Sequence, residues 1–207
     1  MNGHKKHILF IGDSITDSSR REDPERIGFG YVRLIRDVLM VTQGYTKEQF
    51  TNRGIGGNRV TDLESRWKKD VLDLQPDVLS ISIGINDVWR QLDSPEIEQV
   101  YPEQFETVYT TLLSSVRQET DATLMLMEPT IIEEDSASKG NERLKEYVTI
   151  VNRLANRFEG TLVPTHQAFL GMLNQYPQTT LTTDGVHMNS TGDMLMAQTW
   201  LKSYSAM

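Results

Sequence analysis

The stretch His7-Ile8-Leu9-Phe10-Ile11-Gly12-Asp13-Ser14-Ile15-Thr16-Asp17 decides how the chain begins to fold. Residues 8–11 form an uninterrupted apolar run, which is typical of a parallel strand that is buried on both faces. Gly12 ends the run, because glycine tolerates a sharp bend and the close approach of neighbouring backbone. Ser14 therefore follows the carboxyl end of the first predicted strand, at the edge where open α/β sheets bind their ligands.

A serine at this position has two interpretations. A hydroxyl is a weak nucleophile, and it needs a general base and hydrogen-bond donors for the oxyanion. Without these partners, Ser14 and Thr16 would only hydrogen-bond a turn or cap a helix. The choice between the two depends on what the rest of the chain brings to the same edge of the sheet.

Length and composition indicate an ordinary globular protein. The 207 residues fit a single domain, 1–207, with a full hydrophobic core. Hydrophobic residues make up 38% and charged residues 24%, unlike a disordered chain. The net charge of −8 disfavours nucleic acid and anionic membranes as partners. Because the chain has no cysteine, disulfides, thiolate metal sites and cysteine nucleophiles are excluded.

The sequence shows no evident targeting segment. Lys5 and Lys6 precede an apolar run, as in a signal peptide, but the run ends at Ile11 and Asp13 follows almost at once. No stretch approaches the length that a bilayer-spanning helix needs. We therefore expect a cytoplasmic protein.

Predicted strands and helices alternate along the chain. After 8–11, strands are predicted at 49–52, 77–83, 123–127 and 161–164. Apolar residues at helical spacing predict helices at about 31–44, 60–74, 102–118, 142–158, 167–174 and from 190 onward. This alternation predicts a three-layer α/β/α sandwich with about five parallel strands in flavodoxin-like order. The polar residues 132–141 are expected to form a loop near the mouth of the sheet.

Two further strand ends carry candidate polar groups. One leads into Asn52-Arg53-Gly54-Ile55-Gly56-Gly57-Asn58, a glycine-rich turn before a helix, where free N–H groups suit an anionic oxygen. This turn lacks the Gly-x-Gly-x-x-Gly fingerprint of dinucleotide binding. The next strand leads into Gly84-Ile85-Asn86-Asp87, so Asn86 is expected at the same edge. A plain tight turn and a helix-capping asparagine are the simpler interpretations of these two features.

The last informative stretch is Thr182-Thr183-Asp184-Gly185-Val186-His187, just before the final helix. A carboxylate in this position accepts from the imidazole Nδ1–H, which leaves Nε2 free to take a proton from a serine. By itself the stretch is explained as well by a capped turn and a surface histidine. The four stretches together, however, supply a nucleophile, a base, an orienting carboxylate and oxyanion donors.

The four stretches resemble the sequence blocks of the SGNH hydrolases, also called the GDSL esterase/lipase family. The matching residues are Gly12-Asp13-Ser14-Ile15, Gly57, Gly84-Ile85-Asn86-Asp87 and Asp184-Gly185-Val186-His187, and they span nearly the whole chain in the family's order. Within the family, residues 11–17, 30–32 and 84–91 are most similar to the intracellular bacterial acetylxylan esterases. The resemblance implies the flavodoxin-like SGNH-hydrolase fold.

The resemblance also implies a role for each catalytic residue. Ser14 would be the nucleophile, His187 the base and then the acid, and Asp184 the group that orients the histidine. The implied reaction is hydrolysis of short-chain esters, with acetyl esters of carbohydrates expected, through an acyl-enzyme. The family implies no metal and no organic cofactor.

Three donors would form the oxyanion hole. They are the backbone N–H groups of Ser14 and Gly57 and the side-chain amide of Asn86. Gly57 is expected rather than Gly56, because it stands five residues after Asn52, as in the family's Asn-x-x-x-x-Gly pattern.

Further residues are candidates for substrate contact. Asp13, Trp89 and Arg90 lie next to the predicted site residues. Trp89 would stack on a sugar face and Arg90 would donate to sugar hydroxyls, although core packing is an equally good interpretation of Trp89. Residues 181–183 have no aromatic where the acetylxylan esterases carry one, so the resemblance does not extend to that sugar platform.

Other functions stay open at this point. A lysophospholipase or thioesterase of the same family would act on long acyl chains, but no apolar patch suited to a lipid chain stands out in the sequence. A flavodoxin-like module that binds phosphate, FMN or carbohydrate without catalysis is the alternative from another class, although Asp13 and Asp17 would repel phosphate. The acyl group, the alcohol and the formation of a homo-oligomer are left open.

Overall fold

Five parallel strands form the sheet on which the helices pack in this computed structural model, which describes residues 5–207. The strands are β1 (Ile8–Gly12), β2 (Phe50–Gly54), β3 (Val78–Ser82), β4 (Thr123–Met127) and β5 (Thr161–Val163). Their order is β2-β1-β3-β4-β5, which is the flavodoxin-like order. The predicted fold class is therefore confirmed.

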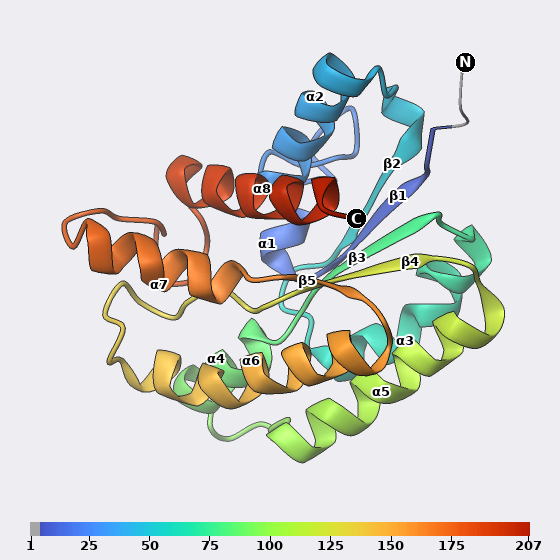
Figure 1. The fold of residues 1–207 in the computed structure, drawn as a ribbon. Coiled ribbons are helices and arrows are strands. Elements are labelled where there is room, and N and C mark those ends of the chain that lie inside the picture. The colour runs from blue at the N-terminus through green and yellow to red at the C-terminus, as the bar shows by residue number, and fades with distance from the viewer. Residues whose placement is uncertain (1–4) are drawn as a thin grey trace.

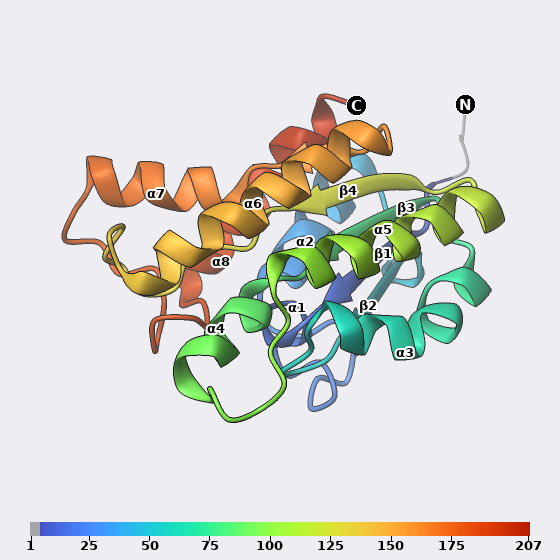
Figure 2. The ribbon, with the colours of Figure 1, turned by 90° about the horizontal axis from the view of Figure 1, so that it is seen from below.

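Helices cover both faces of the sheet, which gives three layers (Figures 1 and 2). The helices α2 (Tyr31–Gln43) and α8 (Ser190–Ser205) pack together on one face, and α7 (Thr165–Gln175) packs against α8. The helices α3 (Val60–Asp70), α5 (Pro102–Glu119) and α6 (Lys139–Arg157) cover the other face. All strands run in one direction, so the loops after β1, β2 and β3 meet at one edge.

The core forms because the central strands bury both of their faces. Every residue of β1 and of β3 is buried, as the uninterrupted apolar run at 8–11 predicts. Trp200 of α8 is fully buried against Phe10, with 5.4 Å between the ring centroids. Its indole N–H donates to the Ser80 hydroxyl at 2.9 Å, which satisfies two buried polar groups at once.

Two helices at the edge of the sheet were not expected from the sequence. The first is α1 (Ser14–Asp17), a single turn that directly follows β1. The second is α4 (Ile85–Asp93), which begins after Gly84 at φ 122°. Asn86 therefore lies inside the first turn of α4 and does not cap it. The helix predicted at 60–74 ends at Asp70 and continues as a separate 3₁₀ turn, Leu72–Leu74.

The segment between β4 and α6 is irregular, as predicted, but it is anchored to the core. Ile131 and Ile132 are buried, although the segment was expected to be polar throughout. The Asn141 side chain accepts from the Ile132 N–H at 2.9 Å and donates to the carbonyls of Glu133 and Asp135. Because the Ser138 hydroxyl caps the first turn of α6 by accepting from the Asn141 N–H, this helix begins at Lys139, earlier than predicted.

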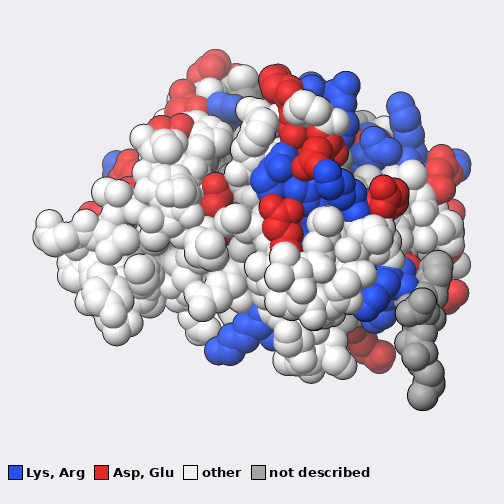
Figure 3. Space-filling view, turned by 90° about the horizontal axis from the view of Figure 1, so that it is seen from above, with Lys and Arg blue, Asp and Glu red and all other residues white. Residues whose placement is uncertain are grey.

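The face over α2 carries charges of both signs side by side (Figure 3). Arg36 pairs with Glu25 and Asp37, and Arg33 pairs with Asp23 and Glu25. Paired charges of this kind are unlike the continuous basic surface that binds nucleic acid.

Within residues 5–207, no helix is both long enough and apolar enough to cross a bilayer.

Candidate active site

Ser14 is the first residue of α1, at the tight junction with β1. Gly12 leaves no room for a side chain, because a Cβ there would lie 2.2 Å from the Ser82 carbonyl oxygen. Asp13 caps the turn, with Oδ1 accepting from the Ile15 N–H at 2.9 Å. The first N–H groups of a helix have no acceptor within it, so the Ser14 N–H is available to an oxyanion.

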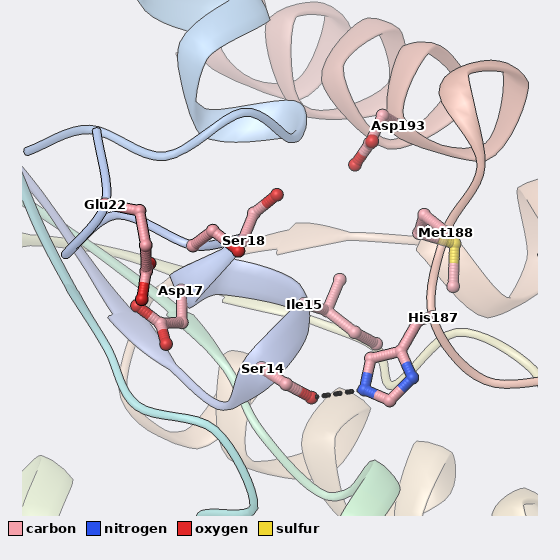
Figure 4. Close-up of a pocket in the computed structure, with 9 residues that line it drawn as sticks. Ser14, Ile15, Asp17, Ser18, Glu22, His187, Met188 and Asp193 are labelled. Atoms are coloured by element: carbon pink, nitrogen blue, oxygen red, sulfur yellow. Dashed lines mark hydrogen bonds between the residues drawn. The ribbon is translucent and has the colours of Figure 1, made fainter. Parts of the chain in front are cut away.

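Ser14, His187 and Asp184 form a hydrogen-bonded chain across positions 173 residues apart. Ser14 Oγ lies 2.9 Å from His187 Nε2 (Figure 4), and His187 Nδ1 lies 2.6 Å from Asp184 Oδ2. Asp184 Oδ1 accepts from the N–H groups of Val186 and His187 at 3.0 and 2.8 Å. The structure thus brings together the three predicted catalytic residues in the order nucleophile, base and orienting carboxylate.

Asp184 is held as a carboxylate by its neighbours. Partial burial acts to raise its pKa, but the hydrogen bonds from the His187 side chain and from two backbone N–H groups prevail. The pKa of Asp184 is therefore lower than its ordinary value. An ionised Asp184 keeps the proton of His187 on Nδ1 and leaves Nε2 as the basic nitrogen that faces Ser14.

Glu134 fixes the loop that carries the histidine, and sequence reasoning missed it. Its Oε1 accepts from the N–H groups of Leu181 and Thr182 and from the Thr182 hydroxyl, the last at 2.6 Å. The neighbouring Glu133 N–H donates to the Gly185 carbonyl at 2.7 Å. These contacts join segments that are about fifty residues apart in the chain, and no local pattern marks them.

The glycine-rich turn and α4 meet beside Ser14. A Cβ placed on Gly56 would lie 3.9 Å from the Ser14 Cβ, and Gly57 adopts φ +78°. The side chain of Asn86 is 1% exposed, and its Nδ2 donates to the Asn58 carbonyl at 3.1 Å. An amide nitrogen carries two hydrogens, so one remains for a second acceptor. The predicted oxyanion donors are thus on segments that lie close to Ser14.

The three further candidates for substrate contact occupy different environments. Asp13 is 1% exposed, and its carboxylate serves the α1 turn, so burial argues against the substrate contact expected from the sequence. Trp89 packs against the core and also lies edge-on to His187, with 5.8 Å between ring centroids. The Arg90 guanidinium lies over the Trp89 ring and pairs with Asp93 at 2.7 Å.

A cavity of about 320 Å³ opens beside the Ser14–His187 pair. Figure 4 shows the carboxylates of Asp17, Glu22 and Asp193 around it, and further lining residues are Ile15, Ser18, Ser19 and Met188. Ser18 and Ser19 both adopt left-handed backbone conformations, at φ 39° and 56°. Strained conformations of this kind gather at functional sites. Residues 18–26 are polar or charged apart from Pro24 and carry no motif that points to the site.

Two buried carboxyl groups lie beneath the site. Asp13 and Asp87 are 1% and 0% exposed, and burial raises the pKa of each to about 7. The hydrogen bond from the Val60 N–H opposes this shift at Asp87, and the nearby charge of Asp13 adds to it. Over the pH range between the ordinary aspartate pKa and about 7, the folded protein therefore binds protons that the unfolded chain has lost.

This difference predicts how stability depends on pH. A raised pKa in the folded state means that the free energy of unfolding falls as pH rises toward about 7. Asp87→Asn removes one of the groups and keeps an oxygen for the Val60 N–H, so its melting temperature should fall less than that of the wild type between pH 5 and 8. Expressed as a free energy of unfolding, the change between pH 5 and 8 should differ between the two proteins by a few kcal/mol at most, at about 1.4 kcal/mol per pKa unit. Melting curves of both proteins, with Asp73→Asn as the exposed control, measure this difference. Parallel curves for Asp87→Asn and the wild type would contradict the pKa of Asp87.

Comparison with known proteins gives consistent matches over nearly the whole chain. A model of the GDSL-like Lipase/Acylhydrolase family matches residues 10–195, which include every residue placed at the site above. An acetylxylan esterase from Geobacillus stearothermophilus is 34% identical over 207 residues, covering 97% of this chain and 94% of that protein. The resemblance predicted from the motifs is confirmed.

Solved structures agree with this result. A catalytic mutant of Axe2, an acetylxylan esterase from Geobacillus stearothermophilus, matches with a TM-score of 0.89 at 32% identity, covering 97% of this chain and 94% of that chain. LAE5, an alpha/beta hydrolase enzyme from the metagenome of Lake Arreo, Spain, matches with a TM-score of 0.88 at 31% identity, covering 98% and 96%. Both similarities extend over the whole sheet and its helices.

Proposed function

Since the chain belongs to the GDSL-like lipase/acylhydrolase family and is a carboxylic ester hydrolase, we propose that it removes acetyl groups from carbohydrates through an acyl-enzyme on Ser14. The observation that carries this proposal is the hydrogen-bonded chain of Ser14, His187 and Asp184 at the wall of a cavity. The proposed roles are nucleophile for Ser14, general base and acid for His187, and orienting carboxylate for Asp184.

The geometry supports a two-step reaction. Ser14 Oγ attacks the ester carbonyl carbon while His187 Nε2 takes the hydroxyl proton across their 2.9 Å contact. The oxyanion receives hydrogen bonds from the N–H groups of Ser14 and Gly57 and from the Asn86 amide. His187 then gives its proton to the departing alcohol oxygen, which leaves the acyl group on Ser14. A water molecule then attacks the carbonyl carbon of this acyl-enzyme while His187 takes one of its protons. His187 returns that proton to Ser14 Oγ as the bond between Oγ and the acyl carbon breaks, which releases the acid and the free serine.

Size and polarity of the cavity support a short acyl group and a hydroxylated alcohol. Its volume of about 320 Å³ is at the low end for ligand pockets. The carboxylates of Asp17, Glu22 and Asp193 at its wall are acceptors for sugar hydroxyl groups. The similar proteins described above as acetylxylan esterases support the same substrate class.

An apolar groove elsewhere on the protein corrects one expectation. The sequence analysis found no apolar patch suited to a lipid, yet α2 and α8 enclose a groove of about 530 Å³. It is lined by Val38, Val41, Met194 and Leu201 among others, and Val41 is 87% exposed. Among residues 5–207, none lines both this groove and the cavity at Ser14. The groove therefore gives no direct support to a long-chain acyl hydrolase.

Acyl-chain preference tests the proposal. We expect kcat/KM to be highest for the acetyl member of a series of p-nitrophenyl esters and to fall by roughly tenfold or more toward octanoyl and dodecanoyl, since the small polar cavity cannot enclose a long chain. Acetylated xylo-oligosaccharides, assayed by acetate release, test the alcohol in parallel. A maximum at octanoyl or longer would instead favour a lysophospholipase or thioesterase activity.

A further inference from the structure

Arg66, a partly buried arginine of α3, joins three segments at the edge of the site. Its side chain is 12% exposed, and its Nη2 donates to the carbonyl of Gly12, the residue that ends β1. Its Nη1 donates to the carbonyl of Arg53 in β2 at 2.7 Å and to Asp70 at 2.9 Å. Its Nε donates to the Asn58 side-chain oxygen at 2.8 Å. One guanidinium thus fixes the turn after β1 relative to the glycine-rich loop after β2.

Asn58 passes this restraint on to Asn86. Asn58 directly follows Gly57, and its side chain is held by Arg66. Its backbone carbonyl accepts from Asn86 Nδ2 at 3.1 Å, which orients the amide proposed to donate to the oxyanion. An unbroken set of hydrogen bonds therefore runs from the ends of β1 and β2 to the side chain on α4.

Asp87 binds the end of the same glycine-rich loop, where α3 begins. Its Oδ1 accepts from the N–H of Val60, the first residue of α3, at 3.1 Å. Its Oδ2 is buried and has no hydrogen-bond partner among residues 5–207. An unpaired buried oxygen costs about 1–3 kcal/mol of stability. That cost makes stability alone a poor explanation for a carboxylate at this position.

We propose that Arg66, acting through Asn58, and Asp87 are positioning residues of the oxyanion hole. Together they clamp loop 55–60 so that the Gly57 N–H and the Asn86 amide stay in place relative to Ser14. Donors stabilise a transition state to the extent that they are already in place, and a misplacement of about 1 Å costs up to about 10²-fold in rate. The inference rests on the proposed serine mechanism and adds to it residues to which no catalytic role was assigned above.

Asn58→Ala tests the Arg66 side of the clamp. It removes the acceptor of Arg66 and leaves the backbone carbonyl that binds Asn86. We expect kcat for p-nitrophenyl acetate to fall by roughly 10- to 100-fold, with KM within about twofold of the wild type. Asn58→Asp keeps an acceptor oxygen for Arg66 and should restore most of kcat.

Asp87→Ala tests the other side, with Asp87→Asn as the conservative variant. Alanine releases the Val60 N–H, whereas asparagine keeps an oxygen for it, so we expect a similar loss of kcat in the first variant and recovery in the second. Asp73→Ala is the matched control for both sites. It removes an exposed carboxylate that pairs with Lys68 in the last turn of α3, away from loop 55–60, so its kcat should stay near the wild-type value.

A boronic acid inhibitor separates positioning from general structural damage. Its tetrahedral adduct on the serine places an oxygen in the hole, so its inhibition constant should rise by the factor by which kcat falls. Melting temperatures establish that each variant is folded. If Asp87→Ala does not fold, the comparison of Asn58→Ala with Asn58→Asp tests the inference. Wild-type kcat in folded Asn58→Ala, losses confined to KM, or an equal loss in Asp73→Ala would each overturn the inference. If Ser14→Ala is inactive while Asn58→Ala and Asp87→Ala are fully active, this inference fails and the proposed function stands.

Discussion

Replacing Ser14 with alanine should lower the esterase kcat by about 10⁶-fold, the size of loss found when a serine hydrolase loses its nucleophile. The reason is that His187 Nε2 faces the Ser14 hydroxyl at 2.9 Å and would have no oxygen to activate in the variant. Residual turnover should come only from the oxyanion donors acting on water. The measurement is steady-state hydrolysis of p-nitrophenyl acetate, with melting curves to show that the variant is folded.

A matched serine variant makes the Ser14 result specific. Ser65 is exposed on α3 and donates only to a backbone carbonyl one turn away, so Ser65→Ala should keep wild-type kcat. Turnover by Ser14→Ala within tenfold of the wild type would exclude Ser14 as the nucleophile. The serine mechanism proposed for the site would then fail as a whole.

Replacing Asn86 with alanine should give the second largest loss, a fall in kcat of roughly 10²–10³ with little change in KM. The Asn86 amide is buried, and one of its two hydrogens is already bound by the Asn58 carbonyl. The other would meet the oxyanion, whose charge develops only in the transition state, so substrate binding should hardly change. Kinetic constants for p-nitrophenyl acetate and the inhibition constant of a boronic acid measure the two effects.

The competing explanation of Asn86 is a structural one. Gly84 rather than Asn86 caps α4, so capping does not account for the asparagine. An Asn86→Ala protein whose lost activity matched only its unfolded fraction would nevertheless restore the structural explanation. A rise in KM with unchanged kcat would equally contradict a role confined to the transition state.

The sheet and the main site residues were predictable because their signals are local. The apolar run before Gly12 marks a buried strand, and strand ends of a parallel sheet meet at one edge. Polar residues directly after three such strands were therefore expected to converge. The approach of Gly56 to Ser14 and the hydrogen bond from Asn86 to Asn58 agree with that expectation. The short helix α4 was missed although its apolar residues Ile85, Val88, Trp89 and Leu92 recur at helical spacing, so the sequence did carry a local signal for it.

The supporting residues were not predictable because their contacts are not local. Arg66 and Glu134 each bind backbone groups of segments that are distant in sequence, and neither lies in a recognisable motif. Asp13 lies in a motif, but only the structure shows that the α1 turn uses its carboxylate. In the apolar groove, Val41 and Met194 come from helices that meet only in the folded chain.

Labelling with a fluorophosphonate tests the central proposal most directly. The reagent reacts with a serine that a neighbouring base has activated, and tandem mass spectrometry of the digested protein locates the modified residue. We expect one label per chain on Ser14, with activity lost in proportion to labelling and no label in the Ser14→Ala protein. A label on another residue, or complete inactivation with Ser14 unmodified, would contradict the assignment of Ser14 as the nucleophile.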